Sequence, residues 1–164
     1  MMQNTFHNHS NSHDYILWLL PAAFAAHVFE EYTLGFIPIM QTIAAPHGIV
    51  LSWQDFFVVN IVVLVWGFCS AAIGWRLPVF SLTFPGMMII NAVVHIVSSF
   101  IIGKPSPGVI TGTVLYIPLS IWVYRAARAD MILKKNSLYF VFGLTILFHL
   151  FAAGLILLRP NNIF

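Results

Sequence analysis

The sequence predicts an all-α membrane protein, a bundle of about five transmembrane helices, and three observations support this fold class. Hydrophobic residues make up 60% of the 164 positions, and charged residues make up only 7%. A soluble domain carries about 25% charged residues, so this chain has too few to cover a surface in water. Five continuous apolar stretches approach the roughly 20 residues that a helix needs to cross a bilayer, and no short alternating strands of a barrel are visible.

The chain divides into a polar tail, residues 1–14, and a single transmembrane domain, residues 15–160. The tail is rich in Asn, Ser and His and lacks the positively charged region and the small-residue cleavage site of a signal peptide, so the first helix is expected to be retained. The five helices are expected at residues 15–36, 56–75, 79–102, 108–127 and 138–158. Each is expected to be helical because unsatisfied backbone groups are too costly in lipid.

The segments between the helices carry turn signals. Residues 37–55 contain Pro38, Pro46 and Gly48, so we expect a loop or a segment that lies in the membrane interface. The link 103–108 contains two prolines between two glycines and predicts a short, stiff turn. Pro160 ends the fifth helix. Tryptophans that fit the level of the lipid head groups are Trp18, Trp53, Trp75 and Trp122.

Charge and cysteine content exclude several classes of protein. The net charge of +2 comes from scattered residues, so a nucleic-acid partner is not expected. Cys69 is the single cysteine, which excludes a disulfide framework. Membrane lipids are the expected partners, and the sequence leaves open whether the chain forms a homo-oligomer.

The basic residues predict the orientation in a cell (inner) membrane. With five helices, five basic residues fall on the side of the amino terminus and two on the other side. The positive-inside rule then places the amino terminus in the cytoplasm and the carboxyl terminus outside. The two groups are Arg76, Arg125, Arg128, Lys134 and Lys135, against Lys104 and Arg159.

The first helix contains polar residues that are expensive inside a membrane. A charged side chain at the centre of a membrane helix costs roughly 2.5–3.5 kcal/mol on insertion scales. His27 lies three residues before Glu30 and four before Glu31, so both pairs share one helix face. We therefore expect this face to point into the bundle.

Further polar residues are expected at the same depth. His27 lies about twelve residues, or roughly 18 Å, into the first helix. Asn91 and His95 share a face of the third helix, and His149 lies at a comparable position in the fifth. Since the second and fourth helices enter from the other side, Asn60 and Thr111 fall in the same layer. With the predicted orientation, this layer is in the outer half of the membrane.

The predicted layer favours a site with catalytic residues His27, Glu30, Glu31, Asn91 and His95. Imidazole and carboxylate are ligands that suit zinc or iron, so His27, Glu31, His95 and His149 are candidate ligands of one divalent transition metal. Asn60 and Thr111 are candidates to bind such a cofactor from neighbouring helices. Without a metal, two adjacent carboxylates in a dry site would divide into an acid and a base, which suits proton transfer.

Three short motifs in this order resemble the HXXEE family of small membrane proteins. They are the segments 27–31 (HVFEE), 91–95 (NAVVH) and 108–111 (GVIT). The resemblance implies an integral membrane protein whose activity is not established and which is often suspected to be an enzyme. His149 is not part of these motifs, so its role depends on the depth argument alone.

Three functions are compatible with these residues. The first is an intramembrane enzyme that acts on a lipid-like or other apolar substrate, by metal-assisted hydrolysis or by acid–base isomerisation. The second is a proton- or metal-coupled transporter, in which the same groups form a relay. The third is a membrane assembly subunit. The enzyme is favoured, because a transporter often shows inverted repeats, which are not visible, and an assembly subunit needs no buried carboxylate pair.

Overall fold

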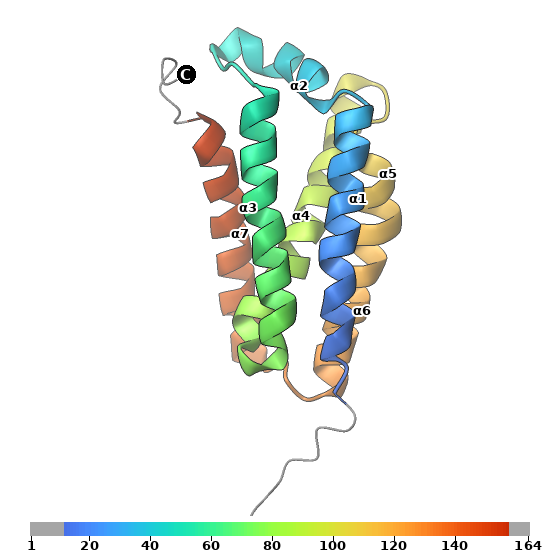
Figure 1. The fold of residues 1–164 in the computed structure, drawn as a ribbon, viewed down its shortest axis with the longest axis vertical. Helices are drawn as coiled ribbons and strands as arrows, with labels where there is room; N and C mark the ends of the chain where they lie inside the picture. The colour runs from blue at the N-terminus through green and yellow to red at the C-terminus, as the bar shows by residue number, and fades with distance from the viewer. Residues whose placement is uncertain (1–11, 158–164) are drawn as a thin grey trace, which may run out of the picture.

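The structure, a computed structural model, describes residues 12–157, and all regular structure in that range is helical. Long helices run side by side along the longest axis, and α2 lies across one end of them (Figure 1). The sequence-based prediction of an all-α bundle is thus confirmed. Residues 1–11 of the predicted polar tail, with His7 and His9, and residues 158–164 at the end of the chain lie outside the described residues.

The helices follow one another along the chain with short connections. A 3₁₀ turn, η2, leads directly into α1, and a second, η3, follows α2. The helix α5 continues through a π-helical turn, η5, into α6. The bounds are η2 (Asp14–Trp18), α1 (Leu19–Thr33), α2 (Phe36–Ala44), η3 (Ala45–His47), α3 (Trp53–Ile73), η4 (Gly74–Arg76), α4 (Pro78–Ile102), α5 (Val109–Thr111), η5 (Gly112–Tyr116), α6 (Ile117–Ala129) and α7 (Lys135–Leu157).

Within the described range, three helical stretches are long and apolar enough to cross a membrane. They are Trp53–Arg76, Pro78–Ile102 and Val109–Ala129, and α7 contributes a shorter apolar run. Large apolar side chains on the outer face of α3 are exposed, among them Val58, Ile61 and Val65. In water such an apolar surface would be unfavourable, whereas in a bilayer it contacts the apolar acyl chains of the lipids.

The ends of the helices follow from particular residues. Ser52 precedes α3, and its hydroxyl accepts a hydrogen bond from the Asp55 N–H at 3.1 Å, which satisfies one free donor of the first turn. Pro78 opens α4, where its missing N–H costs nothing. Gly103 ends α4 in the left-handed conformation that glycine adopts without strain.

The segment 37–55, predicted as a loop or an interfacial segment, contains a helix. The helix α1 ends at Thr33, and the chain turns at Gly35, which has a φ of +73°. Phe36, which the sequence assigned to the end of the first helix, instead opens α2. No residue of α2 is buried, and Gln41 hydrogen-bonds the Ile49 carbonyl and the Leu51 N–H at 2.9 and 2.7 Å. The helix is therefore held against the chain that follows it.

The helix α4 lies at the centre of the bundle and contacts α3, η5, α6 and α7. Small residues allow the close contacts: a Cβ atom at Gly67 of α3 would lie 2.6 Å from Phe84 of α4. A Cβ atom at Gly112 of η5 would lie 3.3 Å from the Cα of Ala92. Small residues at such crossings are typical of helices that pack in lipid.

At the end of the bundle away from α2, a cluster around Asp130 joins three segments. Its carboxylate accepts hydrogen bonds from the His13 N–H at 2.8 Å and the Trp75 indole N–H at 2.8 Å, and it lies 2.6 Å from the His13 ring. Burial opposes the ionisation of Asp130, but these hydrogen bonds outweigh it, so its pKa lies below its ordinary value. His13, from the predicted polar tail, is thus held in the fold.

Candidate functional site

The polar residues of α1 and α4 meet in a buried cluster centred on Glu31. Its Oε1 atom lies 3.1 Å from Nε2 of His95 and 3.6 Å from Nε2 of His27. The three side chains are between 94% and 99% buried. His27 and Glu31 lie one turn apart on α1, and His95 projects from α4, so the cluster joins two helices.

The imidazole rings of His27 and His95 have similar surroundings. Their ring centroids are 4.8 Å apart, and their planes meet at 74°. Each Nδ1 atom is next to a hydroxyl group: that of His27 is 2.8 Å from Oγ1 of Thr111, and that of His95 is 3.4 Å from Oγ of Ser106. Because each Nδ1 atom faces a hydroxyl group, both Nε2 atoms are directed toward Glu31.

Gly108 permits the close approach of the two rings. It has a φ of +95°, and a Cβ atom there would lie 2.7 Å from Cε1 of His27 and 2.8 Å from Cε1 of His95. No side chain other than glycine fits this space. The glycine of the predicted motif at 108–111 therefore forms part of the wall of the cluster.

Glu30 has a different environment from Glu31. Its carboxylate accepts hydrogen bonds from the backbone N–H groups of Gly108, Ile110 and Thr111 at 3.0, 3.1 and 2.7 Å. These are the free donors at the start of α5, where a negative charge is favourable. Glu30 thus connects α1 to α5 and keeps the Thr111 hydroxyl next to His27.

Tyr116 belongs to the cluster, although the sequence analysis did not select it. Its side chain is fully buried, and its ring centroid lies 4.4 Å from that of His27. Its hydroxyl has no hydrogen-bond partner within the described residues. Tyr116 follows Thr111 by five residues, a spacing that a π-helical turn brings onto one side and an α-helix does not. Ser106 was also missed, because the link 103–108 was interpreted only as a turn.

The other predicted site residues lie outside the group of three. Asn60 donates a hydrogen bond to the Phe56 carbonyl of its own helix at 2.9 Å and lines a small cavity with Phe24 and Val28. Asn91 lies one turn before His95 on α4, and its Oδ1 atom is buried with no hydrogen-bond partner in the described part of the chain. His149 is half-buried on α7 and is not one of the three residues whose ligand atoms converge.

The three converging side chains could hold a metal ion. One ligand atom from each of His27, Glu31 and His95 lies within 4.8 Å of the others. Two ligands at about 2.0–2.1 Å from a tetrahedral zinc ion are about 3.3 Å apart, which is close to the two distances from Glu31 Oε1, 3.1 and 3.6 Å. The group as a whole spans up to 4.8 Å, so its side chains would move closer together around an ion. Moreover, the Nε2 atom of His27 is buried and has no hydrogen-bond partner among the described residues, so a cation would satisfy it.

Fold and site together define an all-helical membrane protein with a buried His–Glu–His cluster between α1 and α4. The family described as "Protein of unknown function with HXXEE motif" matches residues 18–123, which is well over half of the chain. The chain therefore belongs to the HXXEE family. All three motifs lie inside the matched region, and His149 lies outside it. No curated protein and no solved structure matched the chain.

Proposed function

We propose that this protein is an intramembrane enzyme whose site contains one divalent transition metal, zinc or iron, held by His27, Glu31 and His95. The observation that carries the proposal is the convergence of two Nε2 atoms on one carboxylate oxygen, at 3.1 and 3.6 Å, with hydroxyl groups beside both Nδ1 atoms. Histidine ligands typically donate their other N–H to a neighbouring oxygen, which orients the ring and selects the tautomer.

Each residue around the cluster has a separate task in this proposal. Glu31 supplies the negative charge, and the hydroxyl groups of Thr111 and Ser106 accept the Nδ1–H groups of His27 and His95. Glu30 positions Thr111 through the backbone of α5. When bound, the metal would supply Lewis-acid chemistry in a site that excludes bulk water.

We assign Tyr116 the task of binding the substrate. Its hydroxyl is buried and has no partner in the described part of the chain, and its ring lies against His27. A buried donor without a partner is costly, and a polar group of a bound substrate would remove that cost. In this role the hydroxyl donates a hydrogen bond to the reacting group.

The position of the cluster favours an apolar substrate. The three ligands are buried inside the helical bundle, and the outer face of α3 presents apolar side chains to the surroundings. A charged solute would have to be desolvated to reach such a site, whereas a lipid-like molecule would not. We therefore infer a substrate that partitions into the bilayer.

The basic residues at the Asp130 end support one orientation. Arg76 ends η4, and Arg125 and Arg128 lie in the last part of α6, on that side of the bundle. By the positive-inside rule this end, with the amino terminus, faces the cytoplasm of a cell with this protein in its inner membrane, and the cluster lies nearer the outer surface. Cysteines substituted for Lys104 and Lys134, treated in intact cells with a thiol reagent that does not cross the membrane, test the orientation. We expect the cysteine at 104 to be labelled and the cysteine at 134 to be protected.

Elemental analysis of detergent-purified protein tests the proposed function. We expect about one zinc or iron per chain in the wild type and none in a His95→Ala variant, while His47→Ala, in an exposed position, keeps the metal. A His149→Ala variant decides whether α7 contributes a fourth ligand. Equal metal content in wild type and His95→Ala would overturn the proposed centre. If the wild-type protein contains no metal and its activity still requires Glu31, acid–base chemistry would replace metal chemistry as the proposed mechanism.

A further inference from the structure

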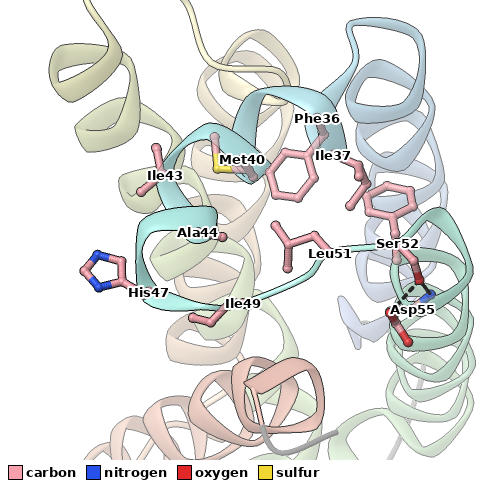
Figure 2. Close-up of a pocket in the computed structure, with 11 residues that line it drawn as sticks. Phe36, Ile37, Met40, Ile43, Ala44, His47, Ile49, Leu51, Ser52 and Asp55 are labelled. Carbon is pink, nitrogen blue, oxygen red and sulfur yellow. Dashed lines mark hydrogen bonds between the residues drawn. The ribbon is translucent and has the colours of Figure 1, made fainter. Parts of the chain in front are cut away.

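A pocket of about 350 Å³ lies between α2 and the start of α3, at the end of the bundle. Figure 2 shows its lining, with Leu51 directed toward Phe36 and the His47 ring on the outer side. Its volume is at the lower end of the range for small-molecule sites, roughly 300–1,000 Å³. The lining residues are Phe36, Ile37, Met40, Ile43, Ala44, His47, Ile49, Leu51, Ser52, Asp55 and Phe56.

One face of α2 forms a wall of this pocket. The lining positions 36, 37, 40, 43 and 44 recur at the spacing of an amphipathic helix. The opposite wall is chain 49–51, which Gln41 holds to α2 through hydrogen bonds of 2.9 and 2.7 Å. Two side chains of the same helix thus have distinct tasks, since Gln41 closes the loop and Met40 lines the space inside it.

The chemistry of the lining selects an uncharged, largely aliphatic ligand. Most lining side chains are apolar, and no described lining residue is Lys or Arg, so an anionic head group would meet no permanent positive charge. The polar lining residues are His47 on the outer side and the pair Ser52 and Asp55, in which the Ser52 hydroxyl donates to the carboxylate at 2.5 Å. The Asp55 carboxylate disfavours an anion and accepts a hydrogen bond from a hydroxyl group.

The pocket is directly connected to the buried cluster by one aromatic ring. Phe36 lines the pocket, and its ring centroid lies 5.8 Å from that of His95. On its other side Phe36 lies 5.8 Å from Phe56, a second lining residue. The Phe36 side chain therefore lies both at the pocket and beside the cluster.

The pocket also lies where a lipid tail would enter the protein. The helix α2 crosses the end of the bundle (Figure 1), where the apolar stretches begin and end. Trp53, at the first turn of α3, packs on Tyr32 with ring centroids 5.1 Å apart, and such aromatic pairs are typical of the membrane interface. This level is the boundary between acyl chains and head groups.

We propose that this pocket binds the alkyl chain of an uncharged single-chain membrane amphiphile, of the class of a long-chain alcohol. Phe36 separates the bound chain from His95 and must turn for the head group to reach the cluster. The assignment of this ligand as the substrate rests on the proposed function, whereas the binding of the chain does not.

Photolabelling in lipid nanodiscs tests the proposal, with 1-hexadecanol carrying a diazirine in its chain as the probe. We expect labelled peptides from residues 36–56 and competition by unlabelled hexadecanol. Ala44→Phe, which fills the pocket, should lower this labelling about tenfold, equivalent to about 1.4 kcal/mol. Ala45→Phe is the matched control, because Ala45 is exposed and does not line the pocket.

Labelling confined to the outer face of α3, without competition by hexadecanol, would overturn the proposal, because it would report only lipid around the protein. The competition in wild type decides this even if Ala44→Phe does not fold. Metal analysis of the same samples separates the two proposals. Labelling that hexadecanol competes away, in protein that contains no metal, would support the lipid pocket and reject the metal enzyme. Bound metal without such competition would support the metal site and reject the lipid pocket.

Discussion

Two carboxylate–histidine clusters lie at different levels of the bundle, one around Asp130 and one around Glu31. Asp130 accepts two hydrogen bonds from N–H groups, from His13 and Trp75, and lies 2.6 Å from the His13 ring. Glu31 faces two imidazoles, and only His95 is within hydrogen-bond distance. The residue types are similar, but the donors available to each carboxylate differ.

This difference separates a structural contact from a candidate site. The oxygens of Asp130 are satisfied by the fold, so the cluster holds three segments together and leaves nothing for a ligand. Around Glu31, the Nε2 atom of His27 and the hydroxyl of Tyr116 have no hydrogen-bond partner in the described residues. Buried polar atoms without partners are costly and often mark a function.

The largest effect is expected for Glu31→Gln, which removes the charged ligand but keeps the shape of the side chain. Metal affinity should fall more than about 100-fold. This exceeds the roughly 10–100-fold loss that is typical when a residue that hydrogen-bonds a metal ligand is changed. Elemental analysis and an activity assay measure the result. Glu30→Gln is the comparison: it should lower metal affinity less than Glu31→Gln does, because Glu30 acts only through Thr111, and the variant should unfold at a lower temperature. Unfolded protein from Glu31→Gln alone would assign Glu31 a structural role.

Gly108→Ala should disturb both imidazoles at once. The new Cβ atom would meet Cε1 of His27 and of His95 at 2.7 and 2.8 Å, so overpacking of about 1–3 kcal/mol adds to the cost of a positive φ. Gly103→Ala is the control, because its φ is +72° and nothing lies within 4 Å of the new Cβ atom. Thermal unfolding in detergent should rank Gly108→Ala well below Gly103→Ala. Equal melting temperatures would contradict the close packing of the rings.

Thr111→Val replaces the hydroxyl group beside Nδ1 of His27 with a methyl group of similar size. Because the hydroxyl orients the ring, we expect metal affinity to fall about 10–100-fold. Thr113→Val is the comparison, since its hydroxyl bonds only the Val109 carbonyl of its own helix at 2.7 Å and is exposed. Metal titration measures both variants. Identical affinities would show that Thr111 does not orient the ligand.

The smallest effect is expected for Asp130→Asn, and it depends on pH. The pKa of Asp130 is lowered in the folded protein, so its contribution is present above the unfolded pKa of about 3.9 and is lost as the pH falls through the folded value. The variant should be less stable than wild type by about 1–3 kcal/mol at pH 7. The difference should shrink below about pH 4. Melting curves at both pH values measure it, and a constant difference would contradict a stabilising role of the ionised Asp130 carboxylate.

Much of the fold could be predicted from hydropathy, because lipid requires long apolar helices. Two details could not. The end of α1 depends on the left-handed conformation of Gly35, and α2 is held by the hydrogen bonds from Gln41 to the chain 49–51. A helix of nine residues that contains Pro38 and is followed by Pro46 gives little signal that distinguishes it from a loop.

Residue depth in the membrane predicts one layer for His27, Glu31, His95 and Thr111, and the structure brings these four together. It could not distinguish the two adjacent glutamates, since their difference arises from the backbone N–H groups of α5. Depth alone also does not determine which face of a helix points inward. Asn60 and His149 have suitable depth, but they are outside the group of three converging residues.

The hydrogen bonds of Glu30 restrict how a molecule from the bilayer reaches the cluster. Separating α1 from α5 would break three bonds to a charged group, each worth about 1.5–3 kcal/mol. These bonds therefore hold α1 and α5 together and oppose entry between them. On the side of α2, by contrast, Phe36 lines the pocket and its ring centroid lies 5.8 Å from that of His95.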